Sequence, residues 1–223
     1  MNFLNVPENI LFKTLESILR FLRQDLEQNE STPQESFLFK ICGDEKGADG
    51  RFSYFKEAKK IFTYKVDDPK FLELTLMFNM QSIKPNTINI SHSGESQGQG
   101  SIGQDTNSYG VYINTDDSYQ DTFGDRFNAT YLLTIVTENT NETIIIYHII
   151  KTMLIAFKAH FTFMGLANIK LGGQDIQIKS EHVPPYMNQK VITFGCEYQA
   201  YSLDIYKQQE ITGIIYNGIL KNQ

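Results

Sequence analysis

Apolar residues recur at helical spacing in two parts of the chain. After Pro7, which suits a first helical turn, one stripe consists of Leu11, Leu15, Ile18, Leu22 and Leu26. After Asn139, a good N-cap residue with Glu142 three positions on, a second stripe consists of Ile146, Ile149, Ile150, Met153, Phe157, Phe161 and Met164. Gly165 is a typical terminator. The patterns predict two main helices, Pro7–Gln28 and a long one over Asn139–Met164.

Alternating apolar and polar residues predict strands elsewhere. In the first half these are Ser36–Cys42, Lys59–Val66, Lys70–Ile83 and Asn86–His92. In the second half they are Ala129–Thr137, Leu166–Leu171, Gln174–Ser180 and Lys190–Tyr206. The pair Gly172-Gly173 predicts a tight hairpin. Inward-facing residues change parity near Gln199–Tyr201, which predicts a bulge in the last strand.

Two segments do not fit a compact core. Ser93–Tyr109 has almost no large apolar side chain, Gly110–Thr115 reads as a short strand, and Asp116–Phe127 is polar again. We therefore interpret residues 93–128 as a long projecting hairpin or loop insertion. Residues 208–223 are rich in isoleucine and are expected to form a C-terminal arm that closes the sheet or docks on a partner. The predicted fold is a single α+β domain over 1–223, with a mostly antiparallel sheet and the two main helices packed on one face.

Composition excludes some classes of function. With 223 residues, 41% of them hydrophobic, the chain can bury a real core. The net charge is −6 and only four arginines are present, which disfavours the phosphate contacts of a sequence-specific DNA-binding protein. No uninterrupted apolar run reaches the length of a membrane span, and the N-terminus lacks the pattern of a secretory signal.

Candidate chemical groups are scattered. Gly98, Gly100 and Gly103 have the spacing of a dinucleotide-binding loop, but no helical pattern follows them. Acidic residues occur in two polar loops, at Asp44, Glu45 and Asp49 and at Asp116, Asp117, Asp121 and Asp125. Four histidines, His92, His148, His160 and His182, are too far apart for a zinc site. Cys42 and Cys196 read as small buried hydrophobes. We therefore predict no catalytic, cofactor-binding or metal-binding residue, and no enzymatic activity.

The order of the predicted elements resembles that of the tail-terminator and head–tail connector ring proteins of tailed bacteriophages, including rings of crAss-like phages. The resemblance covers roughly Pro7–Leu26 and Ala129–Tyr206, and it includes the run from Asp175 to Tyr186 before a long strand. It implies an α+β unit with helices on one face of a mostly antiparallel sheet. It also implies a virion structural protein, assembled in the bacterial cytoplasm, that forms a homo-oligomeric ring at the head–tail junction.

Partners implied by this resemblance are the portal and neighbouring ring or tail proteins, and DNA would pass through an acidic lumen without sequence-specific contacts. The expected interface residues are Tyr109, Val111, Tyr112, Ile113, Tyr119, Phe123, Ile211, Ile214, Ile215 and Tyr216. Two other functions fit the sequence. One is a cytosolic ligand-binding or enzymatic α+β domain that uses Asp116–Asp125 as a metal or substrate loop. The other is a receptor- or glycan-binding tail module that uses tyrosine-rich loops.

Overall fold

The computed structural model describes residues 6–44, 46, 52–76, 85–98, 111–113, 119–174 and 187–203, without the side chains of 111–113, 119–125 and 201–203. Its helices are α1 (Pro7–Gln28), the short 3₁₀ helix η1 (Pro33–Glu35), α2 (Phe37–Cys42), α3 (Tyr54–Thr63), α4 (Thr140–Ala156) and α5 (Lys158–Phe163). Its strands are β1 (Glu73–Leu76), β2 (Thr87–Gln97), β3 (Val111–Ile113), β4 (Tyr119–Thr137), β5 (Ala167–Gln174) and β6 (Asn188–Leu203).

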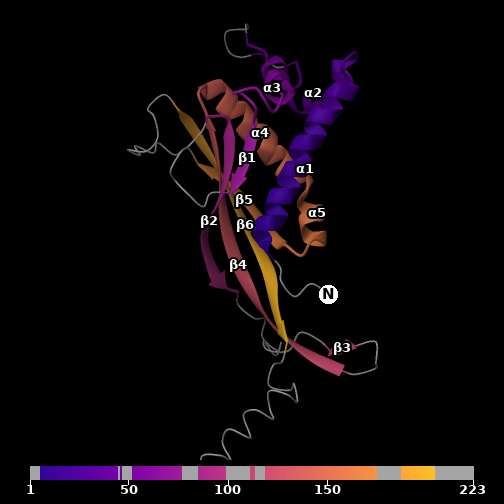
Figure 1. Ribbon diagram of the computed structural model, residues 1–223, viewed down its shortest axis with the longest axis vertical. Helices are drawn as coiled ribbons and strands as arrows, with labels where there is room; N and C mark the ends of the chain where they lie inside the picture. Colours follow the sequence, from indigo (N-terminus) through magenta and orange to yellow (C-terminus); the bar gives the residue numbers. More distant parts are fainter. Residues whose placement is uncertain are drawn as a thin grey trace, which may run out of the picture. The chain divides into compact units, whose positions relative to one another are not determined.

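The described strands form one sheet in the order β1-β2-β4-β6-β5, and β3 pairs with β4 beside this path (Figure 1). The edge strand β1 runs parallel to β2, with Glu73 opposite Thr87. The hairpin strand β3 runs antiparallel to β4, with Ile113 opposite Tyr119. The sheet as a whole is mostly antiparallel, which confirms the predicted α+β class.

The chain divides into two compact units. One unit contains Ser96–Asn128 and Glu197–Gln223 together with Met1–Asn5, and the other contains Val6–Glu95 and Ala129–Cys196. Among the described residues, all five α-helices belong to the second unit, which we call the helical unit. The first, called the hairpin unit, includes β3 and residues 96–128 of the predicted insertion 93–128. The single domain and the projecting insertion stay predictions.

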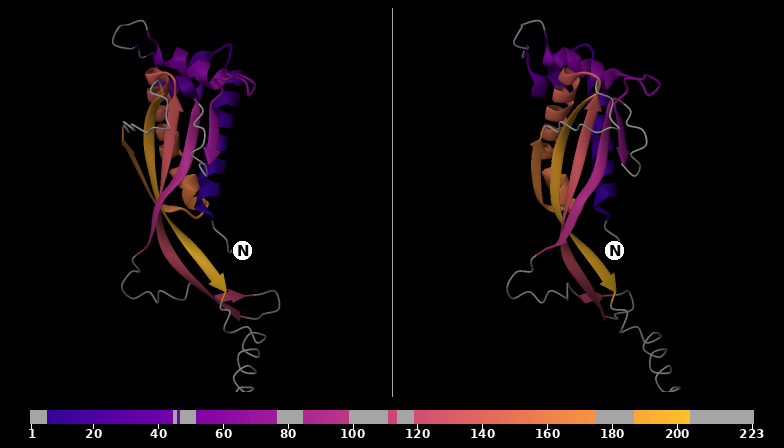
Figure 2. Two further views of the ribbon diagram at one scale, coloured as in Figure 1. Left: turned by 60° about the vertical axis from the view of Figure 1, so that its left-hand side comes forward. Right: turned by 90° about the vertical axis from the view of Figure 1, so that its left-hand side faces the viewer.

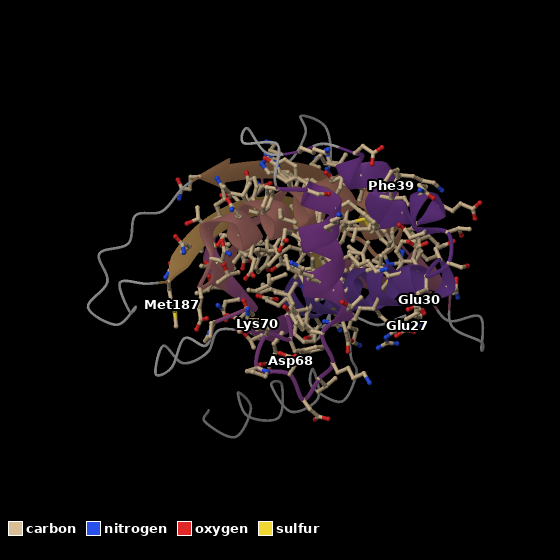
Figure 3. The ribbon with its side chains drawn as sticks, turned by 90° about the horizontal axis from the view of Figure 1, so that it is seen from above. Glu27, Glu30, Phe39, Asp68, Lys70 and Met187 are labelled. Carbon is tan, nitrogen blue, oxygen red and sulfur yellow. The ribbon has the colours of Figure 1, made fainter. Side chains whose placement is uncertain are left out.

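The core of the helical unit lies between its helices and one face of the sheet. Figure 2 shows α1, α4 and α5 on the same side of the strands. The whole α1 stripe is buried, as predicted. On the sheet, Tyr131, Leu133, Ile135, Ile192 and Phe194 are buried. The charged residues Glu27, Glu30 and Lys70 are exposed and lie at the periphery (Figure 3). Burial of this apolar face is therefore what holds the helices on the sheet.

Helix α1 confirms the predicted bounds Pro7–Gln28 and is tied to its neighbours by polar contacts. Asp25 Oδ2 accepts a hydrogen bond from the backbone N–H of Phe37, with 2.6 Å between the atoms. Arg23 Nη2 donates to the carbonyl oxygen of Leu72 at 2.9 Å, and its guanidinium carbon lies 4.1 Å from the centre of the Phe71 ring. These contacts link α1 to the start of α2 and to the chain before β1.

Two predicted strands are wrong, because the structure has helices there. Ser36–Cys42 forms the N-cap and body of α2, and the Ser36 side chain accepts a hydrogen bond from the Phe39 N–H. Lys59–Val66 overlaps α3, which starts after the N-cap Ser53. In such short segments, alternation of apolar residues does not distinguish a strand from a helix. In α3 the buried residues, Ala58, Ile61 and Phe62, follow helical spacing.

The predicted continuous helix Asn139–Met164 is also wrong, because it is two helices. Asn139 is the N-cap, as predicted, and its side-chain oxygen accepts a hydrogen bond from the Asn141 N–H at 2.9 Å. At Phe157 the backbone ψ angle is 6°, so α4 ends and α5 begins there. Gly165, with a φ angle of 94°, follows the end of α5, where a left-handed residue is typical. The break at Phe157 accompanies the packing of Phe161 against Phe194, whose ring centres are 5.1 Å apart.

The strand predictions are correct in part. The predicted hairpin at Gly172-Gly173 is wrong, since β5 continues through both glycines to Gln174. Strand β1 begins at Glu73 rather than Lys70, and residues 77–83 lie outside the described part. Strand β2 extends to Gln97, and β4 begins at Tyr119, so residues predicted as irregular are strand. Strand β6 agrees with the predicted Lys190–Tyr206 as far as Leu203.

Candidate functional site

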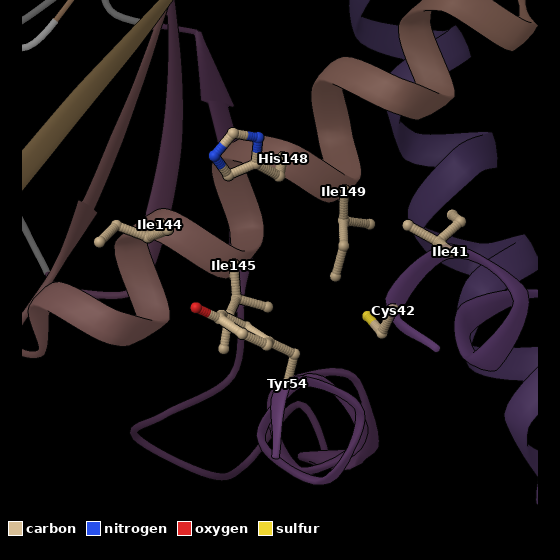
Figure 4. Close-up of a pocket in the computed structure, with 7 residues that line it drawn as sticks. All are labelled: Ile41, Cys42, Tyr54, Ile144, Ile145, His148 and Ile149. Carbon is tan, nitrogen blue, oxygen red and sulfur yellow. The ribbon is translucent and has the colours of Figure 1, made fainter. Parts of the chain in front are cut away.

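A pocket of about 320 Å³ lies in the helical unit, where the end of α2, the start of α3 and the first half of α4 meet (Figure 4). Its lining residues are Ile41, Cys42, Tyr54, Ile144, Ile145, His148 and Ile149. Neighbours three and four positions apart share one side of a helix, so α4 brings Ile144, Ile145, His148 and Ile149 to one wall. The pocket exists because α2 and α3 are helices that place Ile41, Cys42 and Tyr54 opposite this wall.

The pocket has an apolar floor and a mixed rim. Ile145 and Ile149 are 3% and 1% exposed, so they form the floor. Ile41, Cys42 and Tyr54 are partly exposed, and His148 is exposed. In Figure 4 the His148 ring and the Cys42 sulfur lie at separate parts of the pocket, with Ile149 between them in the view. This arrangement does not pair the thiol with the imidazole.

Two titratable groups of the rim, the Cys42 thiol and the His148 imidazole, favour their neutral forms. Burial raises the pKa of the Cys42 thiol to about 11. Burial also lowers the pKa of His148, and the positive charges of Lys190 and Lys151 lower it further. At neutral pH the pocket therefore presents a thiol and a neutral imidazole. A cysteine nucleophile needs the thiolate, so these values oppose a nucleophilic role for Cys42.

Positive charge gathers beside the His148 end of the pocket. The ammonium nitrogens of Lys190 and Lys151 lie 5.0 Å and 5.4 Å from the centre of the Tyr147 ring. Lys151 Nζ also donates a hydrogen bond to Tyr147 Oη at 3.3 Å. The Tyr147 and His148 rings are 5.1 Å apart and perpendicular. Both ammonium groups thus lie over the ring of Tyr147, the neighbour of His148 in the chain, and the ring stabilises their positive charge electrostatically.

The sequence-predicted interface residues fall into two groups. Val111, Tyr112 and Ile113 form β3, and Tyr119 and Phe123 belong to β4. The register pairs Ile113 with Tyr119, Tyr112 with Gln120 and Val111 with Asp121, so the structure brings four of the five into one hairpin ladder and places Phe123 further along β4. The other five, Tyr109, Ile211, Ile214, Ile215 and Tyr216, lie outside the described residues.

The remaining chemical candidates are dispersed. Gly98 donates its N–H to the Arg126 carbonyl oxygen at 2.7 Å, whereas Gly100 and Gly103 lie outside the described residues. His92 packs against Tyr131, with 5.3 Å between ring centres, and His160 lies on α5. Asp44 follows α2. Within the described ranges, no group of three or more His, Cys, Asp or Glu side chains could hold a metal ion.

Sequence reasoning missed the pocket. The signal that could have found it was the run Ile144–Ile149, in which apolar residues cover more of the helix surface than one stripe. The opposite wall was hidden because Ser36–Cys42, which forms α2, reads as a strand, and because no helix is predicted at the start of α3, where Tyr54 lies. Among the helices that the structure describes, none is long and apolar enough to cross a membrane.

Comparison with known proteins adds no family to this geometry. No protein-family model matches the sequence, and no curated protein matches it.

Proposed function

We propose that this chain is a non-enzymatic structural protein of a virion, which assembles into a homo-oligomeric ring at the head–tail junction of a tailed phage. The observation that carries the proposal is the β3–β4 hairpin. It belongs to a compact unit separate from the helices, and its ladder pairs Ile113 with Tyr119 next to Tyr112 and Gln120. Aromatic and large apolar side chains dominate the energetics of protein interfaces, so such a hairpin suits a contact between subunits.

The element order supports the same proposal. Over the parts of the chain that carry the resemblance, α1, β4, α4, α5, β5 and β6 keep the expected succession of a helix, a strand, a helical segment and a long last strand, although the helical segment is divided in two and the hairpin at Gly172-Gly173 is absent. The sheet is mostly antiparallel, and Figure 2 shows α1, α4 and α5 on one side of the strands, which is compatible with that architecture.

The proposed mechanism is geometric. A head-to-tail interface between identical subunits closes into a ring when the rotation from one subunit to the next is a whole-number fraction of a full turn. The hairpin of each subunit packs on its neighbour or on an adjacent portal, ring or tail protein. The chain carries a net charge of −6, and negative charge on the lumen would repel passing DNA and prevent adhesion.

The experiment compares three purified proteins by mass photometry and electron microscopy. Wild type is expected to form closed rings. The double variant Tyr112→Ser/Tyr119→Ser removes two aromatic anchors from the hairpin and should give folded monomers. The control Phe163→Ser removes an aromatic residue that is 87% exposed on α5, and it should keep the ring. A wild-type monomer at all concentrations, or an unchanged ring in the double variant, would contradict the proposal.

A further inference from the structure

The pocket between α2, α3 and α4 is asymmetric in a way that points to a ligand. Its floor and one wall are aliphatic, formed by Ile144, Ile145 and Ile149. Its only imidazole stands at the rim, on the next helical turn after Ile144 and Ile145. Pockets of this kind, mostly apolar with a few polar groups on one side, are the usual form of small-molecule sites.

Positive charge lies near the His148 side of the pocket. Lys151 follows His148 by three residues on α4, and Lys190 of β6 lies over the ring of Tyr147, which is itself in edge contact with the His148 ring. Both ammonium groups are held beside Tyr147, which is 8% exposed. Because burial and both lysines disfavour protonation of His148, the ring stays neutral and keeps one N–H donor at neutral pH. The rim therefore offers a donor and two nearby cations to an incoming group.

We propose that this pocket binds a small amphipathic anion, whose apolar body lies on Ile145 and Ile149 and whose carboxylate or phosphate group lies at the His148 rim, toward Lys151 and Lys190. The two cations oppose a ligand with a positive head group, since like charges repel. A wholly apolar ligand would gain nothing from the imidazole N–H or from the two positive charges. The proposal concerns the helical unit alone, so it stands independently of ring formation.

The volume limits the ligand. At about 320 Å³ the pocket is at the lower end of the range of about 300–1,000 Å³ typical of ligand sites. It accommodates a short alkyl chain or a single ring rather than a long acyl chain. Octanoate and octyl phosphate carry the same body with the two candidate head groups, so they distinguish a carboxylate ligand from a phosphate ligand.

The test uses the full chain with isoleucine methyl groups labelled for NMR, because four isoleucines line the pocket. Titration with octanoate and octyl phosphate is expected to shift the methyl signals of Ile41, Ile144, Ile145 and Ile149. The buried Ile18 of α1 and Ile88 of β2 serve as internal controls and should not shift. Octanol should bind more weakly than both anions, and octylammonium most weakly. The tighter of the two anions identifies the head group.

Variants separate the apolar and the charged contributions. Ile144→Trp fills the pocket and should abolish the shifts. Lys151→Gln and Lys190→Gln should each weaken binding of the anions by about two- to fivefold and leave octanol unchanged. Lys13→Gln on the exposed side of α1 is the matched control and should bind as wild type. If Ile144→Trp does not fold, alkylation of Cys42 by N-ethylmaleimide replaces it, since bound octanoate should slow that reaction in wild type.

Three results would overturn the proposal. One is a titration in which the four pocket methyls do not move. Another is equal affinity for octanoate, octanol and octylammonium, which would show that the rim does not recognise an anion. The third is binding that persists unchanged in Ile144→Trp, or an alkylation rate of Cys42 that octanoate does not alter.

Discussion

At the scale of single residues, Tyr147 connects three elements of the helical unit. Its ring carries the ammonium groups of Lys151 from α4 and Lys190 from β6, and its hydroxyl lies beside the backbone of Gly173 in β5. A Cβ atom added to Gly173 would lie 1.8 Å from Tyr147 Oη. The glycine is therefore required by a close approach between a strand and a side chain, rather than by a turn.

A pair of neighbouring substitutions tests this requirement. Gly173→Ala must displace Tyr147 and with it both lysines, so we expect a loss of about 1–3 kcal/mol in unfolding free energy. Gly172→Ala is the control, because its Cβ would meet Thr193 Cβ at an ordinary 3.5 Å, and it should stay within about 0.5 kcal/mol of wild type. Urea denaturation followed by circular dichroism measures both. Equal losses in the two variants would show that Tyr147 moves freely.

The low pKa of His148 predicts a pH dependence of stability. In the unfolded chain this group titrates near its ordinary value of about 6.5, and in the folded chain its pKa is lower. The unfolded chain therefore binds the proton more readily, and stability falls as the pH drops through 6.5. We expect His148→Gln to flatten the decrease in urea midpoint between about pH 7.5 and pH 5.5, whereas His160→Gln on α5 should keep it. An unchanged slope in His148→Gln would refute this assignment.

At the scale of elements, the separation of α4 from α5 determines which phenylalanine contributes most to the free energy of unfolding. Phe161 is fully buried and packs on Phe194, whereas Phe157 at the break is partly exposed. Phe161→Ala should cost about 3–5 kcal/mol. Phe157→Ala should cost only about 1–2 kcal/mol, in proportion to its smaller burial. A larger loss for Phe157→Ala in denaturant melts would mean that the segment packs as one continuous helix.

The elements that the sequence predicted well are those with long patterns. The stripe of α1 has five buried positions from Leu11 to Leu26, and a strand pattern would fail at several of them. Helix α2 has only six residues, and its aromatic side chains alternate as they would in a strand. Its helical state depends on tertiary contacts that no local pattern encodes, such as the Phe37–Phe21 and Phe39–Phe55 ring pairs at 5.6 Å and 5.1 Å. The Gly172-Gly173 pair reads as a turn because paired glycines are common in turns. The actual reason for Gly173 is its contact with Tyr147, which is distant in sequence and leaves no local pattern.

The difference between local and distant contacts also explains which parts of the pocket could be predicted from the sequence. The α4 wall of the pocket could be predicted, because Ile144, Ile145 and Ile149 are adjacent on a helix with a clear N-cap. The positions of Cys42 and Tyr54 in the pocket could not be predicted, since they depend on how α2 and α3 pack against α4. Lys190 comes from a strand forty residues beyond, and its effect on His148 has no local signal in the sequence.

At the scale of the whole molecule, the apolar segment 208–223 is predicted to serve assembly. Deletion of these residues leaves the sequence of the helical unit intact, so the truncated protein should remain folded and lose ring formation. Size-exclusion chromatography measures the assembly, and circular dichroism measures the fold. A truncated chain that unfolds or aggregates as a monomer would show that the segment belongs to its own core.

The division of the chain into interleaved units has a consequence during synthesis on the ribosome. Helix α1 is made first, yet α5, one of the elements it packs on, follows more than a hundred residues later, after the hairpin segment 96–128. The part of α1 that packs on α5 therefore stays uncovered while the chain elongates, although α2 and α3, which also pack on α1, follow it directly. Contacts so distant in sequence form slowly, and waiting apolar surface is prone to aggregation. Yield of this protein should thus depend on elongation rate and on chaperones that cover the emerging helix.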